Sequence, residues 1–241
     1  MRYKCIVAYD GTCFHGFQIQ NDLRTVQLEI ENVLKIIAKK EVKISSAGRT
    51  DTGVHALNQV FHFDLDIKMK DWQMQNALNS RLPRDIYIKS VESVSSDFHS
   101  RYNALSKEYH YLLDLGEYNP IYTNYRYYYK HKLDIDKMID ASKVYIGEHD
   151  FSSFTKNHKN ENNVRKIYDI SFERIGTLVT IKFIGNGFLH NMVRIMVAML
   201  IEVGRGKITK EDLVDILDAK NRKKAPKIAP ANALYLMNIK Y

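Results

Sequence analysis

Segments with the two-residue period of β-strands and segments with the period of α-helices follow one another along the chain. The strand-like segments are 3–9, 59–66, 85–94, 107–115, 125–130, 164–174, 178–185 and 233–240. The helix-like segments are 25–40, 71–82, 134–147, 187–203 and 209–219. Short turns separate several consecutive strands, such as the turn at Gly176, and short turns favour antiparallel hairpins. The pattern therefore predicts an α+β fold with a largely antiparallel sheet flanked by helices.

The mixed strand and helix pattern occurs twice, and this predicts two halves. A chain of 241 residues with 45% hydrophobic residues can bury one large core or two small ones. The simplest division gives an N-terminal half, 1–104, and a C-terminal half, 105–241. Thr25, Asp134 and Thr209 stand where helix N-caps are expected, and Gly147 and Gly204 stand where helices are expected to end.

The charge of the chain favours a polyanionic partner. It carries 36 Lys and Arg against 28 Asp and Glu, a formal net charge of +8. Two basic segments, "TKNHKNENNVRK" (155–166) and "KNRKKAPK" (220–227), could contact phosphates. Sixteen Tyr and ten Phe add side chains that can stack on bases, although most aromatic residues lie in protein cores. The composition thus indicates nucleic-acid binding.

Cysteines and histidines give no metal site or disulfide framework. Cys5 and Cys13 are too few for either, so two reduced thiols are expected. Asp51 and His55 at i, i+4, with His62 as a third group, can be read as metal ligands, but no further Cys or carboxylate cluster completes the set. A structural or RNA-contacting role for these histidines is favoured instead.

The sequence predicts a cytoplasmic protein. Its first residues, "MRYKCIVAYDG", have a strand pattern and not that of a signal peptide. The most apolar run, 188–203, contains His190, Asn191 and Arg194 and is too short and too polar for a bilayer span.

The stretch "AGRTDTGVHA" (47–56) is the strongest candidate for a catalytic turn. Gly48 and Gly53 permit tight turns around Asp51, and a guanidinium at Arg49 would favour an ionised carboxylate there. A fixed, ionised carboxylate can act as a nucleophile or as a base. The competing interpretation is a solvated surface turn.

The letters "DTG" (51–53) also occur in aspartic proteases, where two aspartates share one proton. Arg49 would disfavour that shared proton, and the chain has a single "DTG". A protease is therefore disfavoured.

The helix-like run that includes Arg194 is otherwise apolar. A buried arginine is rare unless it is paired. Its partner could be a core carboxylate, a backbone carbonyl or Asp51 itself.

Eight motifs in this order resemble one family across nearly the whole chain, the bacterial tRNA pseudouridine synthase A family. They are "YDGTCFHGFQIQ" (9–20), "SAGRTDTGVHALNQVFHF" (46–63), "LNSRLPRDI" (78–86), "DFHSRYNALSKEYHY" (97–111), "GEHDFSSF" (147–154), "NGFLHNMVRIMV" (186–197), "EVGRG" (202–206) and "APANALYL" (229–236). The "GRTD" turn together with the "MVR" segment is the most specific part of the resemblance.

The resemblance implies two RRM-like (ferredoxin-like) halves around an extended, mainly antiparallel sheet. It implies a homodimer that holds tRNA, with no metal and no organic cofactor. Asp51 matches the catalytic aspartate, and Arg49 matches an arginine implicated in base flipping and in pairing with that aspartate. Tyr109 matches the tyrosine that stacks on the target base, and Arg194 matches the arginine that forms a salt bridge with the catalytic carboxylate.

The implied reaction converts uridine to pseudouridine at positions 38, 39 and 40 of the tRNA anticodon stem-loop. The N1–C1′ bond breaks and a C5–C1′ bond forms after the nucleotide has flipped out of its stem. The carboxylate could attack C1′ or remove the 2′ proton to form a glycal, and the sequence leaves both routes open.

Three residues depart from the family pattern. They are Phe17 in place of Trp, and Ala198 and Ala233 in place of Gly. They keep a related enzyme that acts on ribosomal RNA as the alternative. A non-catalytic RNA-binding protein is less favoured, because all four site residues are present.

Overall fold

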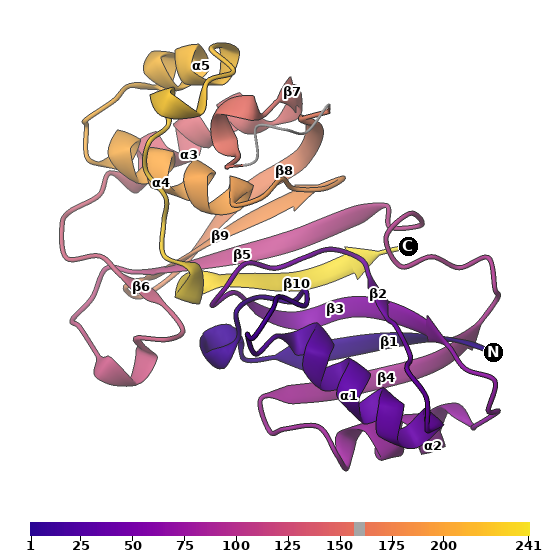
Figure 1. The fold of residues 1–241 in the computed structure, drawn as a ribbon. Coiled ribbons are helices and arrows are strands. Elements are labelled where there is room, and N and C mark those ends of the chain that lie inside the picture. The colour runs from indigo at the N-terminus through magenta and orange to yellow at the C-terminus, as the bar shows by residue number, and fades with distance from the viewer. Residues whose placement is uncertain (157–161) are drawn as a thin grey trace. The chain divides into compact units, whose positions relative to one another are not determined.

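The computed structural model describes residues 1–156 and 162–241. The chain divides into two compact units, Met1–Leu105 with Tyr235–Tyr241, and Ser106–Leu234 (Figure 1). The described residues contain ten strands, most of them paired antiparallel, and five α-helices. The predicted α+β class with largely antiparallel pairing is therefore confirmed. The functional roles assigned to the halves 1–104 and 105–241 stay predictions.

The first unit is a sheet with β1 at its centre and two helices on one face (Figure 1). β1 (Arg2–Tyr9) pairs antiparallel with β3 (His55–Asp64) and β4 (Ile86–Val94), whereas β10 (Leu234–Lys240) joins β3 in parallel. The remaining elements are β2 (Ser45–Ser46), α1 (Val26–Ala38) and α2 (Asp71–Asn79). The last strand of the chain thus completes the unit that the first strand begins.

The second unit has an antiparallel sheet with three helices. β5 (Ser106–Asp114) pairs with β9 (Leu178–Gly185), β9 with β8 (Val164–Ile175), and β8 with β7 (Gly147–Asp150). The remaining elements are β6 (Tyr127–Tyr128), α3 (Ile135–Ser142), α4 (Met192–Gly204) and α5 (Lys210–Asp218). Gly176 turns the β8–β9 hairpin at φ +61°, as expected for a position that favours glycine.

The three predicted N-caps are confirmed. The side chain of Thr25 accepts a hydrogen bond from the Leu28 N–H, and that of Asp134 accepts one from Lys137. Thr209 and Asp212 form a reciprocal capping box at the start of α5. Local side-chain chemistry therefore sets where these helices begin.

Two helix limits differ from the prediction by five residues. The helix expected at 187–203 begins only at Met192, because Asn191 has a left-handed backbone, φ +61°. The helix expected at 134–147 ends at Ser142 and tightens into a 3-10 turn that buries Tyr145 completely. Gly147 does not stop that helix but begins β7.

Two strands also differ in length from the prediction. The strand expected at 59–66 begins four residues earlier, because the stretch after the "GRTDTG" turn pairs with β1 from Ala56 onward. The strand expected at 125–130 is reduced to β6, since only Tyr127 and Tyr128 pair with β5. None of the described helices is long and apolar enough to cross a bilayer.

His62 on β3 shows what a buried histidine does in this fold. Its side chain is 5% exposed, and its Nδ1 accepts a hydrogen bond from the Ser100 N–H at 3.2 Å. The Ser100 hydroxyl donates to the Ser45 carbonyl at 2.6 Å. Burial, with a contribution from the charge of Arg2, lowers the pKa of His62 to about 4. His62 is thus a neutral, structural acceptor.

The fold should lose stability as the pH falls from about 6.5 to about 4. In this window the unfolded chain binds a proton at His62 that the folded chain rejects, so protonation favours unfolding. We expect His62→Gln, which keeps an acceptor but does not titrate, to show a smaller drop in Tm than the wild type between pH 7 and pH 4. Equal drops in the two proteins would contradict this role for His62.

Candidate active site

The predicted catalytic turn joins β2 to β3 and is anchored at its start. The Ala47 N–H donates to the Val60 carbonyl at 2.8 Å. The Gln59 amide donates to the Gly48 carbonyl at 2.9 Å. Gln59 is itself fully buried, so the first half of the turn is tied to the interior face of β3.

The segment around Asp51 is held by backbone contacts with the loop that follows β1. The Phe17 N–H donates to the Thr50 carbonyl at 3.2 Å, and the Gly53 N–H donates to the Phe14 carbonyl at 3.3 Å. The Val54 N–H donates to the Asp51 carbonyl at 3.1 Å, and this hydrogen bond closes the turn. Asp51 itself is half-buried. Its position is therefore set by backbone atoms on both sides.

A buried pair of hydroxyl groups supports the same turn from β1. The Thr50 hydroxyl lies 2.8 Å from that of Tyr9. Burial raises the pKa of Tyr9 above its ordinary value, so the phenol stays neutral. This contact fixes the residue that immediately precedes Asp51.

Arg49 is exposed. Within residues 1–156 and 162–241, the structure shows no ion pair or hydrogen bond of its side chain, including one with Asp51. The predicted pairing of Arg49 with Asp51 is thus absent from this state of the protein. The role of Arg49 in base flipping stays a prediction.

His55, at the end of the turn, is a structural residue. Its side chain is 2% exposed, and its Nδ1 accepts a hydrogen bond from the Gly11 N–H at 3.0 Å. Asp10 Oδ1 approaches the same nitrogen at 3.2 Å, but Nδ1 is the acceptor of the Gly11 hydrogen bond and so carries no proton to share with Asp10. The ring stacks on Tyr235 with centroids 4.7 Å apart. No group of three metal-ligating side chains occurs among the described residues.

Tyr109 lies on β5, opposite Phe183 of β9. It is 8% exposed, and the ring of Phe188 meets it edge to face at 5.1 Å. These contacts hold the tyrosine ring in one orientation.

Arg194 lies in the first turn of α4 and is half-buried. Its Nε donates to the Ala229 carbonyl at 2.8 Å, and its Nη1 donates to Asn191 Oδ1 at 2.7 Å. The Ala229 N–H donates in return to the Arg194 carbonyl at 3.1 Å. A backbone carbonyl, one of the partners considered from the sequence, is thus present. The pairing of Arg194 with Asp51 stays a prediction.

The four predicted site residues belong to different units. Arg49 and Asp51 lie in the first, and Tyr109 and Arg194 lie in the second. Their assembly into one site stays a prediction. Sequence reasoning gave no role to Gly16 or Asn191, although both lie in quoted motifs. Their signals are conformational, since both have a positive φ.

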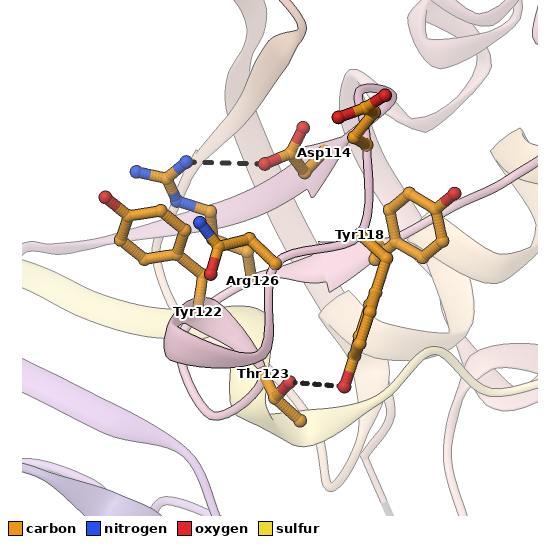
Figure 2. Close-up of a pocket in the computed structure, with 8 residues that line it drawn as sticks. Asp114, Tyr118, Tyr122, Thr123 and Arg126 are labelled. Carbon is orange, nitrogen blue, oxygen red and sulfur yellow. Dashed lines mark hydrogen bonds and ion pairs between the residues drawn. The ribbon is translucent and has the colours of Figure 1, made fainter.

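The second unit also has a shallow hollow, which Figure 2 shows. Arg126 lies 4.0 Å over the ring of Tyr122 and 3.3 Å from Asp114, and the hydroxyl of Tyr118 bonds that of Thr123 at 3.0 Å. The enclosed space, about 10 Å³, is at the lower limit for one water molecule. None of the four predicted catalytic residues lines it.

Gly16 should be required for the turn that carries Asp51. Its φ is +86°, and a Cβ added there would lie 2.7 Å from the Thr50 carbonyl oxygen. Gly176 has a similar φ, +61°, but open space around it. We expect Gly176→Ala to cost about 1 kcal/mol from backbone strain. Gly16→Ala should cost at least about 1 kcal/mol more, because the contact forces the turn apart.

Urea unfolding of the two variants and the wild type measures this difference. Equal losses in the free energy of unfolding would show that the close approach at Gly16 does not add to the destabilisation.

Comparison with known proteins identifies the family. A family profile described as "tRNA pseudouridine synthase" matches residues 5–103 and 141–241. The chain is 46% identical to "tRNA pseudouridine synthase A" of Limosilactobacillus reuteri, with 100% of this chain and 96% of the relative aligned. It is 44% identical to "tRNA pseudouridine synthase A 1" of Bacillus cereus, covering 98% of that protein, and 44% identical to "tRNA pseudouridine synthase A" of Listeria welshimeri, covering 99%. The chain, whose "GRTD" turn and "MVR" helix both lie in the matched ranges, therefore belongs to the tRNA pseudouridine synthase family.

Proposed function

We propose that this chain isomerises uridine to pseudouridine in the anticodon stem-loop of tRNA, with Asp51 as the group that acts on the ribose. The observation that carries the proposal is the geometry of the turn. The backbone on both sides of a half-buried aspartate is fixed by hydrogen bonds at Thr50, Gly53 and Val54, in a chain of this family. A preorganised carboxylate needs no rearrangement when the substrate arrives.

The reaction needs few chemical groups. The N1–C1′ bond breaks, the uracil turns over, a C5–C1′ bond forms, the proton on C5 leaves, and N1 takes up a proton. Asp51 either attacks C1′ and is displaced when C5 bonds there, or removes the 2′ proton and returns it when the new bond forms. Atoms and electrons balance within the nucleotide, so the isomerisation consumes no oxidant and no second substrate.

The other three residues have distinct proposed roles. Arg49, exposed on the same turn as Asp51, is suited to occupy the space that the flipped nucleotide leaves in the RNA. Tyr109, held by Phe188, provides a fixed ring on which the uracil can stack. Arg194 provides a held cation that favours the ionised form of the catalytic carboxylate.

We further propose that the protein works as a homodimer in the cytoplasm, where it would meet its tRNA substrate. Sedimentation equilibrium would then give twice the chain mass of 28.1 kDa. A single-chain mass at micromolar concentration would exclude the dimer.

Asp51→Asn should abolish the activity. The amide neither attacks C1′ nor removes a proton, so we expect the rate of tritium release from RNA labelled at uridine C5 to fall by about a thousandfold or more. Asp22→Asn makes the same chemical change at an exposed residue of the same unit, and should leave the rate unchanged.

The tritium assay also separates the substrates when bulk tRNA and ribosomal RNA, both from a strain that lacks the gene, are offered side by side. Release from ribosomal RNA alone would keep the chemistry and overturn the tRNA target. RNA binding without release from either would indicate a non-catalytic RNA-binding protein.

The basic segment 220–227 is suited to contact phosphates. Lys223 and Lys224 are exposed and, in the described parts of the chain, make no ion pair. Residues 157–161 of the other basic segment lie outside the described residues. We expect Lys223→Ala/Lys224→Ala to reduce the slope of log affinity against log salt by about 1.5, with little change in kcat.

Filter binding of tRNA across a range of salt concentrations measures this slope. Lys137 and Lys143 already pair with Asp134 and Asp140 at 3.5 and 3.2 Å, so their double Ala variant is the matched control. Equal slopes for the two double variants would contradict a specific contact at 223–224.

A further inference from the structure

Asn191, which precedes α4, is held in an unusual way. It occupies the N-cap position, where an asparagine side chain ordinarily accepts a hydrogen bond from the first turn of the helix. Here the side chain makes no capping bond, and the backbone is left-handed at φ +61° and ψ 6°. The side chain is also buried, with 7% of the residue exposed. The residue therefore gives up a local stabilising bond and adopts a strained backbone.

The side-chain oxygen of Asn191 is directed at Arg194 instead. Oδ1 accepts a hydrogen bond from Arg194 Nη1 at 2.7 Å. A guanidinium only donates hydrogen bonds, so the amide oxygen and not the amide nitrogen must face it. Hydrogen bonds to charged groups are among the stronger ones in proteins.

A second acceptor also orients the guanidinium. The Ala229 carbonyl accepts a hydrogen bond from the Arg194 Nε–H at 2.8 Å. A guanidinium is planar and rigid, so two acceptors on different N–H groups fix its plane and the directions of its remaining N–H groups. Neither acceptor carries a charge, so Arg194 keeps its full positive charge for another partner.

We infer that Asn191 is a positioning residue, whose side-chain oxygen orients the Arg194 guanidinium for its work on the catalytic carboxylate. This inference rests on the proposed function for its catalytic consequence. The local geometry stands on the contacts of Asn191, Arg194 and Ala229 alone. Backbone strain at Asn191 is then the cost of aiming this side chain at Arg194.

The competing explanation is that Asn191 serves only to turn the chain. Asparagine tolerates the left-handed region better than most residues, and glycine tolerates it best. Asn191→Gly keeps the turn and removes the oxygen, whereas Asn191→Asp keeps both the tolerance of the turn and an oxygen acceptor. The two variants therefore separate the backbone role from the side-chain role.

Steady-state tritium release from tRNA labelled at C5 is the first readout. We expect Asn191→Gly to lower kcat by about tenfold to a hundredfold, as for loss of a hydrogen bond to a charged group. KM for tRNA should stay unchanged, because a buried side chain does not contact the RNA. Asn191→Asp should recover only part of kcat, because it restores the oxygen acceptor but adds a carboxylate that competes with the catalytic one for Arg194.

The second readout does not depend on activity. The Nη1–H proton signal of Arg194, assigned by its loss in Arg194→Lys, should exchange with water slowly in the wild type and in Asn191→Asp, where an oxygen accepts its hydrogen bond. It should exchange at least about tenfold faster in Asn191→Gly, because this N–H then has lost its acceptor.

Lys39→Gly is the matched control for the backbone. Lys39 is exposed and has a similar φ, +54°, at the end of α1. This variant should change neither kcat nor the Arg194 signal, whatever its small effect on stability.

The outcomes distinguish the two proposals. The wild type could be inactive while its Arg194 proton exchanges slowly, and faster in Asn191→Gly. That result would overturn the proposed function and keep the positioning contact. An active wild type with Asn191→Gly unchanged in kcat and in exchange would overturn the inference. An Asn191→Asp variant with the same kcat and the same exchange rate of the Arg194 proton as Asn191→Gly would also overturn the inference.

Discussion

Backbone hydrogen bonds between residues 14–17 and 50–53 are the constraint on which the proposed site depends. Asp51 lies outside any helix or strand, so no regular element holds it. Phe14 and Phe17 lie in the core with 1% of each residue exposed, and their backbone groups bond to Gly53 and Thr50. The position of the Asp51 backbone thus follows from the packing of two core phenylalanines. Gly16 between them makes this close approach possible, because any side chain at that position would meet the Thr50 carbonyl.

The second unit holds Arg194 by different means. Eleven of the 13 residues of α4 are buried, so the helix that carries Arg194 is itself a core element. The guanidinium is then oriented by neutral oxygens from Asn191 and Ala229. A carboxylate in either place would compete with the proposed catalytic carboxylate for the same cation. Neutral acceptors orient the arginine without cancelling its charge.

The periodicity of the sequence predicted most strands and helices because their core faces are regular. β1 alternates strictly between buried and half-buried residues, and α1 buries Val26, Ile30, Val33 and Leu34 at helical spacing. Periodicity could not predict that β10 returns to pair with β3, since that contact joins residues about 180 positions apart. It also placed the start of α4 too early. "FLHN" continues an apolar pattern, and only the backbone of Asn191 shows that the helix has not yet begun.

The four candidate site residues could be selected from the sequence because motifs preserve residue types. Motifs do not state contacts, and contacts decide what each residue can do. The sequence paired Arg49 with Asp51 through their spacing, whereas in the structure the exposed Arg49 makes no such pair among the described residues. Conversely, Asn191 carries no charge and no reactive group, so nothing in its chemistry drew attention to it. Its proposed role rests on the 2.7 Å hydrogen bond from Arg194 Nη1 to its Oδ1 and on its positive φ.

The two alanines that replace family glycines, Ala198 and Ala233, both lie in the second unit, which also carries Arg194. Ala198 follows Arg194 by four residues on α4, so it lies on the same face of the helix, and it is 7% exposed. Ala233 is fully buried in the short turn that follows Ala229, which accepts the Arg194 Nε–H. Each adds a methyl group to the packed interior of the unit that holds Arg194.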